Sequence, residues 1–211
     1  VPSLLRGFSA PVVLETELGD DALFTLLAHD LDPFNRWEAV QKLALRRILN
    51  GVKAHGHAEL DARFVEAMRG VLRNPSLDAA FKELVLTLPS EAYVAEQLDV
   101  VDPQRIHAVR EQWRAAMAEV LRDDWVWAFE SHQVTVGYQP LPAQAGPRAL
   151  ANLALAMLCL DATTRGDVIW RVPLAGELSA GIARTVTAPS LMGSVTSRRL
   201  PRVTVPPSKN M

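Results

Sequence analysis

Histidines with acidic or hydroxyl neighbours are the residues of this 211-residue chain that could do chemistry. His55 and His57 could offer two ligands to one metal ion, but a zinc site needs a third protein ligand and the sequence places none. A solvated polar turn is therefore the favoured interpretation. His29, Asp30 and Asp32 form a second such group, yet they fall where one predicted helix ends and the next begins. Helix capping and helix-terminus electrostatics explain them.

Two further groups fall on predicted helices. His107 and Glu111 are four residues apart, a spacing that places both on one helix face, and we expect a surface pair rather than a catalytic base with its partner. Glu130-Ser131-His132 contains a nucleophile and a base. Adjacent residues on a helix do not face each other, so the spacing argues against a Ser-His dyad. A small enzyme that uses His29 or His132 stays the least favoured alternative.

Cys159 and three tryptophans lie on apolar stretches of the predicted helices. A cysteine in such a stretch is typically a buried, unreactive thiol, and a single cysteine excludes an internal disulfide. Trp37, Trp113 and Trp127 are interpreted as core residues rather than as a ligand-stacking surface. The 211 residues contain no His-Glu-x-x-His, no phosphate-binding loop, no Gly-x-Gly-x-x-Gly and no Gly-x-Ser-x-Gly motif. The sequence thus predicts no catalytic, cofactor-binding or metal-binding residue in this chain.

The overall composition is that of a globular protein. The chain is 49% hydrophobic and 22% charged, with a formal net charge of −2. This near-neutral balance gives no electrostatic reason to expect nucleic acid or an anionic membrane as a partner. The sequence shows neither a run of about 18 apolar residues, as a membrane span needs, nor a basic leader before an apolar run. We expect a cytoplasmic protein.

The elements that would position these residues are helices over residues 19–165. Asp32-Pro33 and Asp102-Pro103 each pair a capping aspartate with a proline at the first helical position. The helix after Asp102 is predicted to be the longest and to run towards Trp127. A loop is expected over residues 137–147, before an apolar helix that should be central. Other helix starts are predicted at Asp20 or Asp21, just ahead of Phe64, at Ser76 and at Pro89-Ser90.

Short capped turns between successive helices predict a mainly α fold, an antiparallel helical array of solenoid or bundle type. No repeat of constant period is present, so the pattern indicates no named repeat class. Residues 1–18 differ, because prolines and Gly7 disfavour a helix there. Residues 12–18 alternate in polarity, which predicts one β-strand. That strand either docks on the helices or is the last strand of a β domain that the chain lacks.

The character of the sequence changes again after Gly166. Residues 1–165 hold 16 basic and 22 acidic residues, whereas residues 166–211 hold six basic and two acidic ones. Helical periodicity also ends, so we expect an irregular tail. A shift of the coding frame near residues 166–171 is an open alternative, in which the tail is not the native continuation. A basic binding arm at Arg198-Arg199 is disfavoured because the charges are sparse.

Four blocks of the chain resemble the aminopeptidase N family of zinc metallopeptidases, in its bacterial alanyl-aminopeptidase branch. The most specific are Pro2-Ser-Leu-Leu-Arg-Gly-Phe-Ser-Ala-Pro-Val12 and Asp32-Pro-Phe-Asn-Arg-Trp-Glu-Ala39 with Gln41. The other two are Leu86-Thr-Leu-Pro-Ser90 and Asp102-Pro103 with Val109-Arg-Glu111, which follow in the same order. The resemblance covers about residues 1–165.

The resemblance implies three parts. Residues 1–18 would be the last strand of a β-sandwich domain, residues 19–165 the first part of a C-terminal helical domain, and residues 166–211 a divergent tail. In that family the full enzyme removes N-terminal amino acids from peptides, with a zinc held by His-Glu-x-x-His and a further Glu, while Gly-x-Met-Glu-Asn binds the substrate's amino terminus. No position here matches those motifs. We therefore expect a non-catalytic piece whose partner is the catalytic domain of aminopeptidase N, in the same or a separate chain. The alternative is a free-standing helical module that binds a protein or peptide.

Overall fold

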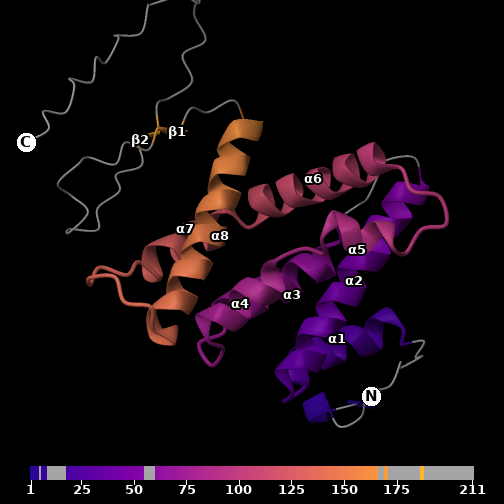
Figure 1. Cartoon of the computed structure of the whole chain (residues 1–211), viewed down its shortest axis with the longest axis horizontal. Coiled ribbons are helices and arrows are strands. Elements are labelled where there is room, and N and C mark those ends of the chain that lie inside the picture. The colour runs from indigo at the N-terminus through magenta and orange to yellow at the C-terminus, as the bar shows by residue number, and fades with distance from the viewer. Residues whose placement is uncertain (5, 9–17, 55–59, 166–168, 171–185, 188–211) are drawn as a thin grey trace, which may run out of the picture.

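A computed structural model describes residues 1–4, 6–8, 18–54, 60–165, 169–170 and 186–187. In this part of the chain the mainly α prediction is confirmed, because eight α-helices account for nearly all regular structure (Figure 1). The predicted strand over residues 12–18 lies outside the described residues except for Leu18, and so does most of the tail.

In order, the elements are η1 (Arg6–Phe8), α1 (Asp20–His29), α2 (Pro33–Lys53), α3 (Ala62–Arg73), α4 (Ala79–Leu86), α5 (Glu91–Ala95), α6 (Pro103–Val120), α7 (Arg122–Ser131), α8 (Pro142–Thr164), β1 (Ile169–Trp170) and β2 (Val186–Thr187). The two strands pair antiparallel.

Local capping chemistry sets several helix starts. The Asp32 carboxylate accepts hydrogen bonds from the backbone N–H groups at the start of α2, and Asp102 does the same for α6. In both helices a proline occupies the first position, where its missing N–H leaves no bond unmade. Ser90 caps α5 in the same way. These three predicted starts are confirmed.

One predicted cap and one predicted start are wrong. The first helix begins at Asp20, as predicted, but the residue before it is Gly19, and neither Asp20 nor Asp21 caps the helix. Both lie in its first turn, where a negative charge is favourable. The fourth helix begins at Ala79 with Asp78 as its cap, not at Ser76. The Ser76 backbone N–H donates instead to the Asn74 side chain, which forms a turn that delays the helix by three residues.

The helix lengths also differ from expectation. The helix that begins at Pro103 ends at Val120, and a break at Leu121 (φ −103°, ψ 20°) separates it from α7. At 23 residues α8 is longer than the 18-residue α6, and it begins at Pro142, inside the predicted loop. Pro147 is thus within a helix, at the cost of one backbone hydrogen bond. Gly146 packs directly on α4, which supports this helical turn from outside.

The core lies where α8 meets α4, α6 and α7, and α2 continues it towards α1 (Figure 1). The prediction that the apolar last helix is central is confirmed. Trp113 and Trp125 are fully buried, and the Trp113 ring lies 4.9 Å from that of Phe64 between centroids. None of the described helices has the length and apolar character needed to cross a bilayer.

Candidate functional site

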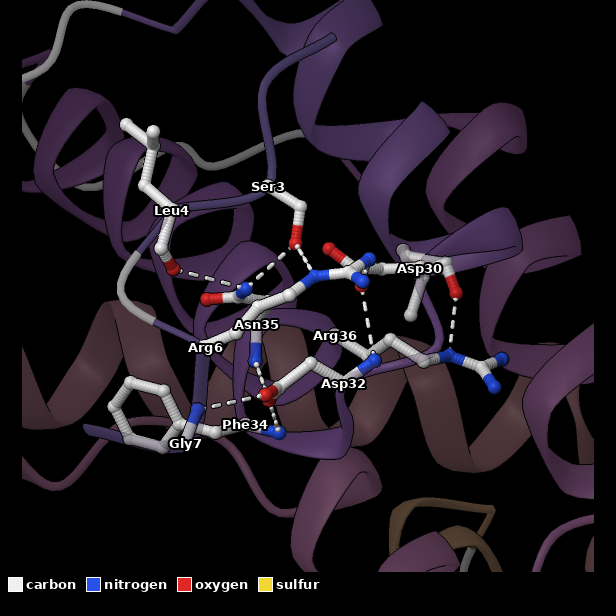
Figure 2. Close-up of polar contacts among 10 residues, drawn as sticks. Ser3, Leu4, Arg6, Gly7, Asp30, Asp32, Phe34, Asn35 and Arg36 are labelled. Atoms are coloured by element: carbon white, nitrogen blue, oxygen red, sulfur yellow. Dashed lines mark hydrogen bonds and ion pairs between the residues drawn. The ribbon is translucent and has the colours of Figure 1, made fainter. Parts of the chain in front are cut away.

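The N-terminal segment, here Ser3, Leu4, Arg6 and Gly7, lies against the junction between α1 and α2 (Figure 2). Asp30, Asp32 and Asn35 receive it, and these three residues are called the anchor site below. Four hydrogen bonds join the segment to the anchor site. The described part of the segment is therefore held by side chains at the junction between the first two helices.

Asp30 follows the last residue of α1, and its side chain is only 1% exposed. Its Oδ1 atom accepts from Arg6 Nη2 at 2.9 Å and from the Asp32 backbone N–H at 2.9 Å. Its Oδ2 atom is buried and has no hydrogen-bond partner of normal geometry. Burial acts to raise the pKa of Asp30, but the nearby Ser3 hydroxyl, the Asp32 N–H and the Arg6 charge outweigh it and hold the pKa below its usual value. The carboxylate is thus charged at neutral pH and needs a cation.

Asp32 links the start of a helix to the segment. Its Oδ1 atom accepts from the N–H groups of Phe34 (2.9 Å) and Asn35 (3.2 Å), while Oδ2 accepts from the Gly7 N–H at 3.3 Å. Gly7 has a φ of 63°, in the left-handed region that favours glycine. One carboxylate therefore both begins α2 and binds the turn at Gly7.

Asn35 completes the site from the first turn of α2. Its Nδ2 group donates to Ser3 Oγ at 2.9 Å and to the Leu4 carbonyl at 3.1 Å, and Arg6 Nε also donates to Ser3 Oγ at 2.7 Å. Asn35 is buried, so these bonds satisfy a group that would otherwise be desolvated without partners. The site can bind a peptide turn through one charge and several backbone or hydroxyl groups.

The structure keeps Asp30 and Asp32 of the predicted group together, joined by the Asp32 N–H, and leaves His29 apart from them. The capping interpretation is confirmed for Asp32, whereas His29 is exposed at the end of α1. Asp30 does more than end a helix, because it binds Arg6, 24 residues away. Reasoning from helix ends missed Arg6 and Asn35. The signal was present, since the two most specific blocks of resemblance, residues 2–12 and 32–39, contain both halves of this contact.

The predicted surface pair of His107 with Glu111 is wrong. His107 Nδ1 lies 2.8 Å from Glu91 Oε1, because α5 packs beside α6 and places that carboxylate over the histidine. Glu111 accepts instead from Arg110 at 3.2 Å and from Arg114 at 3.0 Å. Permanently charged guanidinium groups make the stronger bonds to this carboxylate.

Ser131 and His132 each bond a carbonyl one turn back in α7. Ser131 Oγ donates to the Trp127 carbonyl at 2.6 Å, and His132 Nδ1 lies 2.9 Å from the Ala128 carbonyl. The hydroxyl of Ser131 is thus committed to the backbone. His55 and His57 lie outside the described residues. Among the described residues, no three His, Cys, Asp or Glu side chains are grouped so that they could hold a metal ion.

The predicted core residues have three different environments. Trp113 is fully buried, as predicted, while Trp37 and Trp127 are half-buried at the edge of the core. The Arg73 guanidinium covers the Trp127 ring at 4.3 Å from its centroid, a cation–π contact. Cys159 is only half-buried, so the prediction of a buried thiol is wrong. The buried residues of α8 face α4, α6 and α7. Cys159 lies at the edge of this buried face.

Comparison with known proteins gives the site a context. A family described as a domain of unknown function (DUF3458_C) with ARM repeats matches residues 20–171. Aminopeptidase N of Caulobacter vibrioides is 36% identical over 161 residues, 76% of this chain and 19% of that protein. Aminopeptidase N of Escherichia coli is 33% identical over 172 residues, 80% of this chain and 20% of that protein.

A solved structure agrees with these relatives. The crystal structure of Legionella pneumophila aminopeptidase A in complex with aspartic acid superposes with a TM-score of 0.65 at 25% identity, over 76% of this chain and 20% of that one. The chain thus spans about a fifth of the length of the curated relatives it matches.

Proposed function

This chain belongs to the DUF3458_C family of ARM-repeat domains and is homologous to the C-terminal region of bacterial aminopeptidase N, and we propose that it acts as the helical domain of such a zinc-dependent aminopeptidase. The observation that carries the proposal is the family match over residues 20–171, which includes all of α1 to α8. We propose further that the chain is not catalytic by itself, since its 211 residues contain no zinc-binding His-Glu-x-x-His motif.

In the proposed arrangement the chemistry belongs to the rest of the enzyme. The zinc ion, the peptide substrate and the group that binds its amino terminus lie on a catalytic domain, in the same or a separate chain. Residues 19–165 form an antiparallel helical array that packs over this domain, in the cytoplasm. Residues 1–18 end the preceding β-sandwich domain, and the anchor site then fixes that connection to the first two helices. Residues 166–211 are a divergent tail, and translation of the neighbouring reading frame tests whether it is the native continuation.

The first experiment measures metal and activity in the purified chain. We expect no stoichiometric zinc by plasma mass spectrometry, and no hydrolysis of alanine p-nitroanilide above the buffer rate with or without added zinc. Aminopeptidase N from Escherichia coli, assayed in parallel, is the positive control. Zinc-dependent hydrolysis by this chain would refute a non-catalytic role.

A chimera tests the positive part of the proposal. The matching 161 residues of the Caulobacter vibrioides enzyme would be replaced with those of this chain. We expect the chimera to be folded and to keep bound zinc and aminopeptidase activity, because the helical domain supplies packing rather than chemistry. A chimera that folds but keeps neither property would contradict the assignment.

The alternative of a free-standing binding module is favoured by one observation, namely that the anchor site holds a peptide-like segment through side-chain contacts. A stable one-to-one complex with a purified protein that is unrelated to aminopeptidases would support that alternative.

A further inference from the structure

We propose that a cavity between α7 and α8 binds a small α-hydroxycarboxylate. Arg148 of α8 binds the carboxylate group, and His132, directly after α7, accepts a hydrogen bond from the neighbouring hydroxyl group. The two helices pack against each other (Figure 1). The inference does not depend on the proposed aminopeptidase role.

The cavity is large enough for a small organic molecule. Its volume is about 180 Å³, well above the roughly 10–15 Å³ that one water molecule needs. Both helix regions contribute polar side chains to its wall, His132 and Gln133 from the end of α7, and Arg148 and Asn152 from α8. A wall of this kind favours a compact polar ligand over an extended apolar one.

Arg148 determines the charge of the ligand. Most arginines in the described part of the chain form an ion pair with a carboxylate. The described contacts of half-buried Arg148 are all with neutral groups, namely Gln144 Oε1 at 2.9 Å, the Gln139 carbonyl at 3.5 Å and the Tyr138 ring, whose centroid is 4.8 Å away. A guanidinium has more N–H donors than these two acceptors use, and its planar fork matches a carboxylate. The α8 side of the cavity therefore selects a carboxylate.

His132 supplies an acceptor on the α7 side of the cavity. Its Nδ1 atom lies 2.9 Å from the Ala128 carbonyl oxygen. Because a carbonyl oxygen can only accept, Nδ1 carries the proton of the neutral ring and Nε2 is left as an acceptor. A ligand hydroxyl group donates to such a nitrogen, whereas a second carboxylate oxygen would meet its lone pair unfavourably. A hydroxyl beside the carboxylate thus suits both His132 and Arg148.

Asn152 adds a second donor for the carboxylate. It lies one helical turn after Arg148, so both side chains are on the same face of α8. Within the described part of the chain, the Asn152 side chain has no hydrogen-bond partner, so its amide group is available to a ligand. An amide N–H next to a guanidinium strengthens the preference for an anion.

The wall of the cavity is held in place without a ligand. The bond to Ala128 fixes one edge of the His132 ring, and the ring also meets Trp127 edge to face, with centroids 5.7 Å apart. Gln133 Nε2 donates to the carbonyl of Phe129, one turn back in α7, at 2.6 Å. A ligand would therefore meet side chains whose positions are already set, which reduces the entropic cost of binding.

The test uses three probes of nearly equal size on the full chain. Glycolate has both groups, acetate lacks the hydroxyl, and glycolamide lacks the charge. Saturation-transfer NMR titrations at about pH 8, where histidine rings are neutral, measure the dissociation constants. We expect saturable binding of glycolate with a dissociation constant on the order of 1 mM. Acetate should bind about fivefold more weakly and glycolamide at least about tenfold more weakly.

Two variants assign these preferences to side chains. In R148Q the preference for glycolate over glycolamide should disappear, since the charge that makes it is gone. H132F keeps an aromatic ring beside Trp127 but lacks both nitrogens. In H132F the preference for glycolate over acetate should disappear, while that over glycolamide remains. R63Q is the matched control, because Arg63 is an exposed arginine of α3 that does not line the cavity, and its three affinities should equal those of the wild type.

Each outcome decides the proposal. It is overturned if glycolate does not bind saturably to the wild type, or binds no better than glycolamide. A folded R148Q or H132F chain, shown by circular dichroism, that keeps the preference it should lose would also overturn it. If R148Q does not fold, R148K replaces it, because lysine keeps the charge without the planar fork. A reduced preference for glycolate over glycolamide in R148K then supports the site, and an unchanged one overturns it.

Discussion

Two aspartates at opposite sides of the molecule are equally buried but differently bonded. Asp30, at the α1–α2 junction, and Asp161, near the end of α8, have side chains that are 1% and 2% exposed. Arg122 binds both oxygens of Asp161, each at 2.7 Å, and Arg165 adds a contact at 3.1 Å. Asp30 has one arginine nitrogen and an unbonded Oδ2 atom. Equal burial of two carboxylates therefore does not mean that equal numbers of donors hold them.

The difference follows from what each aspartate joins. The Arg122–Asp161 pair joins the start of α7 to the end of α8, two helices that pack against each other in the core. The hydrogen bond from Arg122, opposed by burial, holds the pKa of Asp161 below its usual range. Asp30 joins the α1–α2 junction to Arg6, whose side chain is 52% exposed. We infer that the Arg122–Asp161 pair contributes more to the stability of the fold than the Arg6–Asp30 pair.

The largest effect is expected from R122A, which removes the more exposed partner of the Arg122–Asp161 pair. Asp161 would stay buried with only Arg165 beside it, and removal of one partner of a buried ion pair costs about 3–5 kcal/mol. Urea unfolding followed by circular dichroism measures the loss. R165A is the control, with an expected loss of about 1 kcal/mol or less, because a half-exposed pair contributes little. Equal losses in the two variants would contradict the comparison.

A second effect tests the packing on the other side of α8. In G146A the new Cβ atom would lie 2.9 Å from the Ala80 backbone nitrogen, so α4 and α8 must separate. Overpacking of this kind costs about 1–3 kcal/mol. G70A is the matched control, because nothing lies within 4 Å of its added Cβ atom and alanine favours the helix by up to about 1 kcal/mol. We expect the melting temperature to decrease in G146A and to increase in G70A, each relative to the wild type.

Acid should weaken both regions. The pKa values of Asp30, Asp124 and Asp161 all lie below their usual value in the folded chain. A depressed folded pKa stabilises the fold above the unfolded value of about 3.9, and the contribution disappears as the pH falls through the folded pKa. The free energy of unfolding should therefore be level from about pH 7 to 5 and decrease below about pH 4.

Variants sharpen this acid effect. The difference between the unfolding free energy at neutral pH and that at about pH 3 should be smaller in D161N than in D30N. D161N loses the larger pH-dependent contribution, because more charged donors hold Asp161 in its ionised form. A smaller difference in D30N than in D161N would reverse the ranking of the two regions.

The smallest effect on global stability is expected from R6A. Arg6 is 52% exposed, and the Arg36 charge and the Asp32 N–H still act on Asp30 after its removal, so we expect a loss of about 1 kcal/mol or less. Its urea midpoint should lie close to that of the wild type, far from that of R122A. A loss as large as that of R122A would show that the Arg6–Asp30 pair stabilises the fold as strongly as the Arg122–Asp161 pair, contrary to the comparison.

Local features were predictable because their causes lie within a few residues. Both α2 and α6 begin with an aspartate followed by a proline, and the aspartate accepts hydrogen bonds from N–H groups two or three residues later. This helix start depends on no distant part of the chain. The same local reasoning failed at Ser76, where the turn at Asn74 competes, and at Leu121, where the apolar stripe continues although the helix breaks. Stripes of apolar residues indicate burial, but they do not show where two helices must part to pack on a third.

The candidate site shows the same division. Asp30, Asp32 and His29 were recognised as a group of functional residue types, and the resemblance marked residues 2–12 and 32–39. Only the tertiary structure brings Arg6 to Asp30 and Ser3 to Asn35, at separations of 24 and 32 residues. The tertiary structure also places His107 in contact with Glu91 rather than with Glu111.

By itself the amino-acid sequence determined the helical character of residues 20–164, several of the helix starts and the relationship to the C-terminal region of aminopeptidase N. Those properties depend on local hydrogen bonds and on the order of residues along the chain. The tertiary structure alone decided that two arginines hold Asp161, whereas Asp30 binds Arg6 of the N-terminal segment. The physical reason is that the energy of a buried charge depends on how many donors distant segments bring to it.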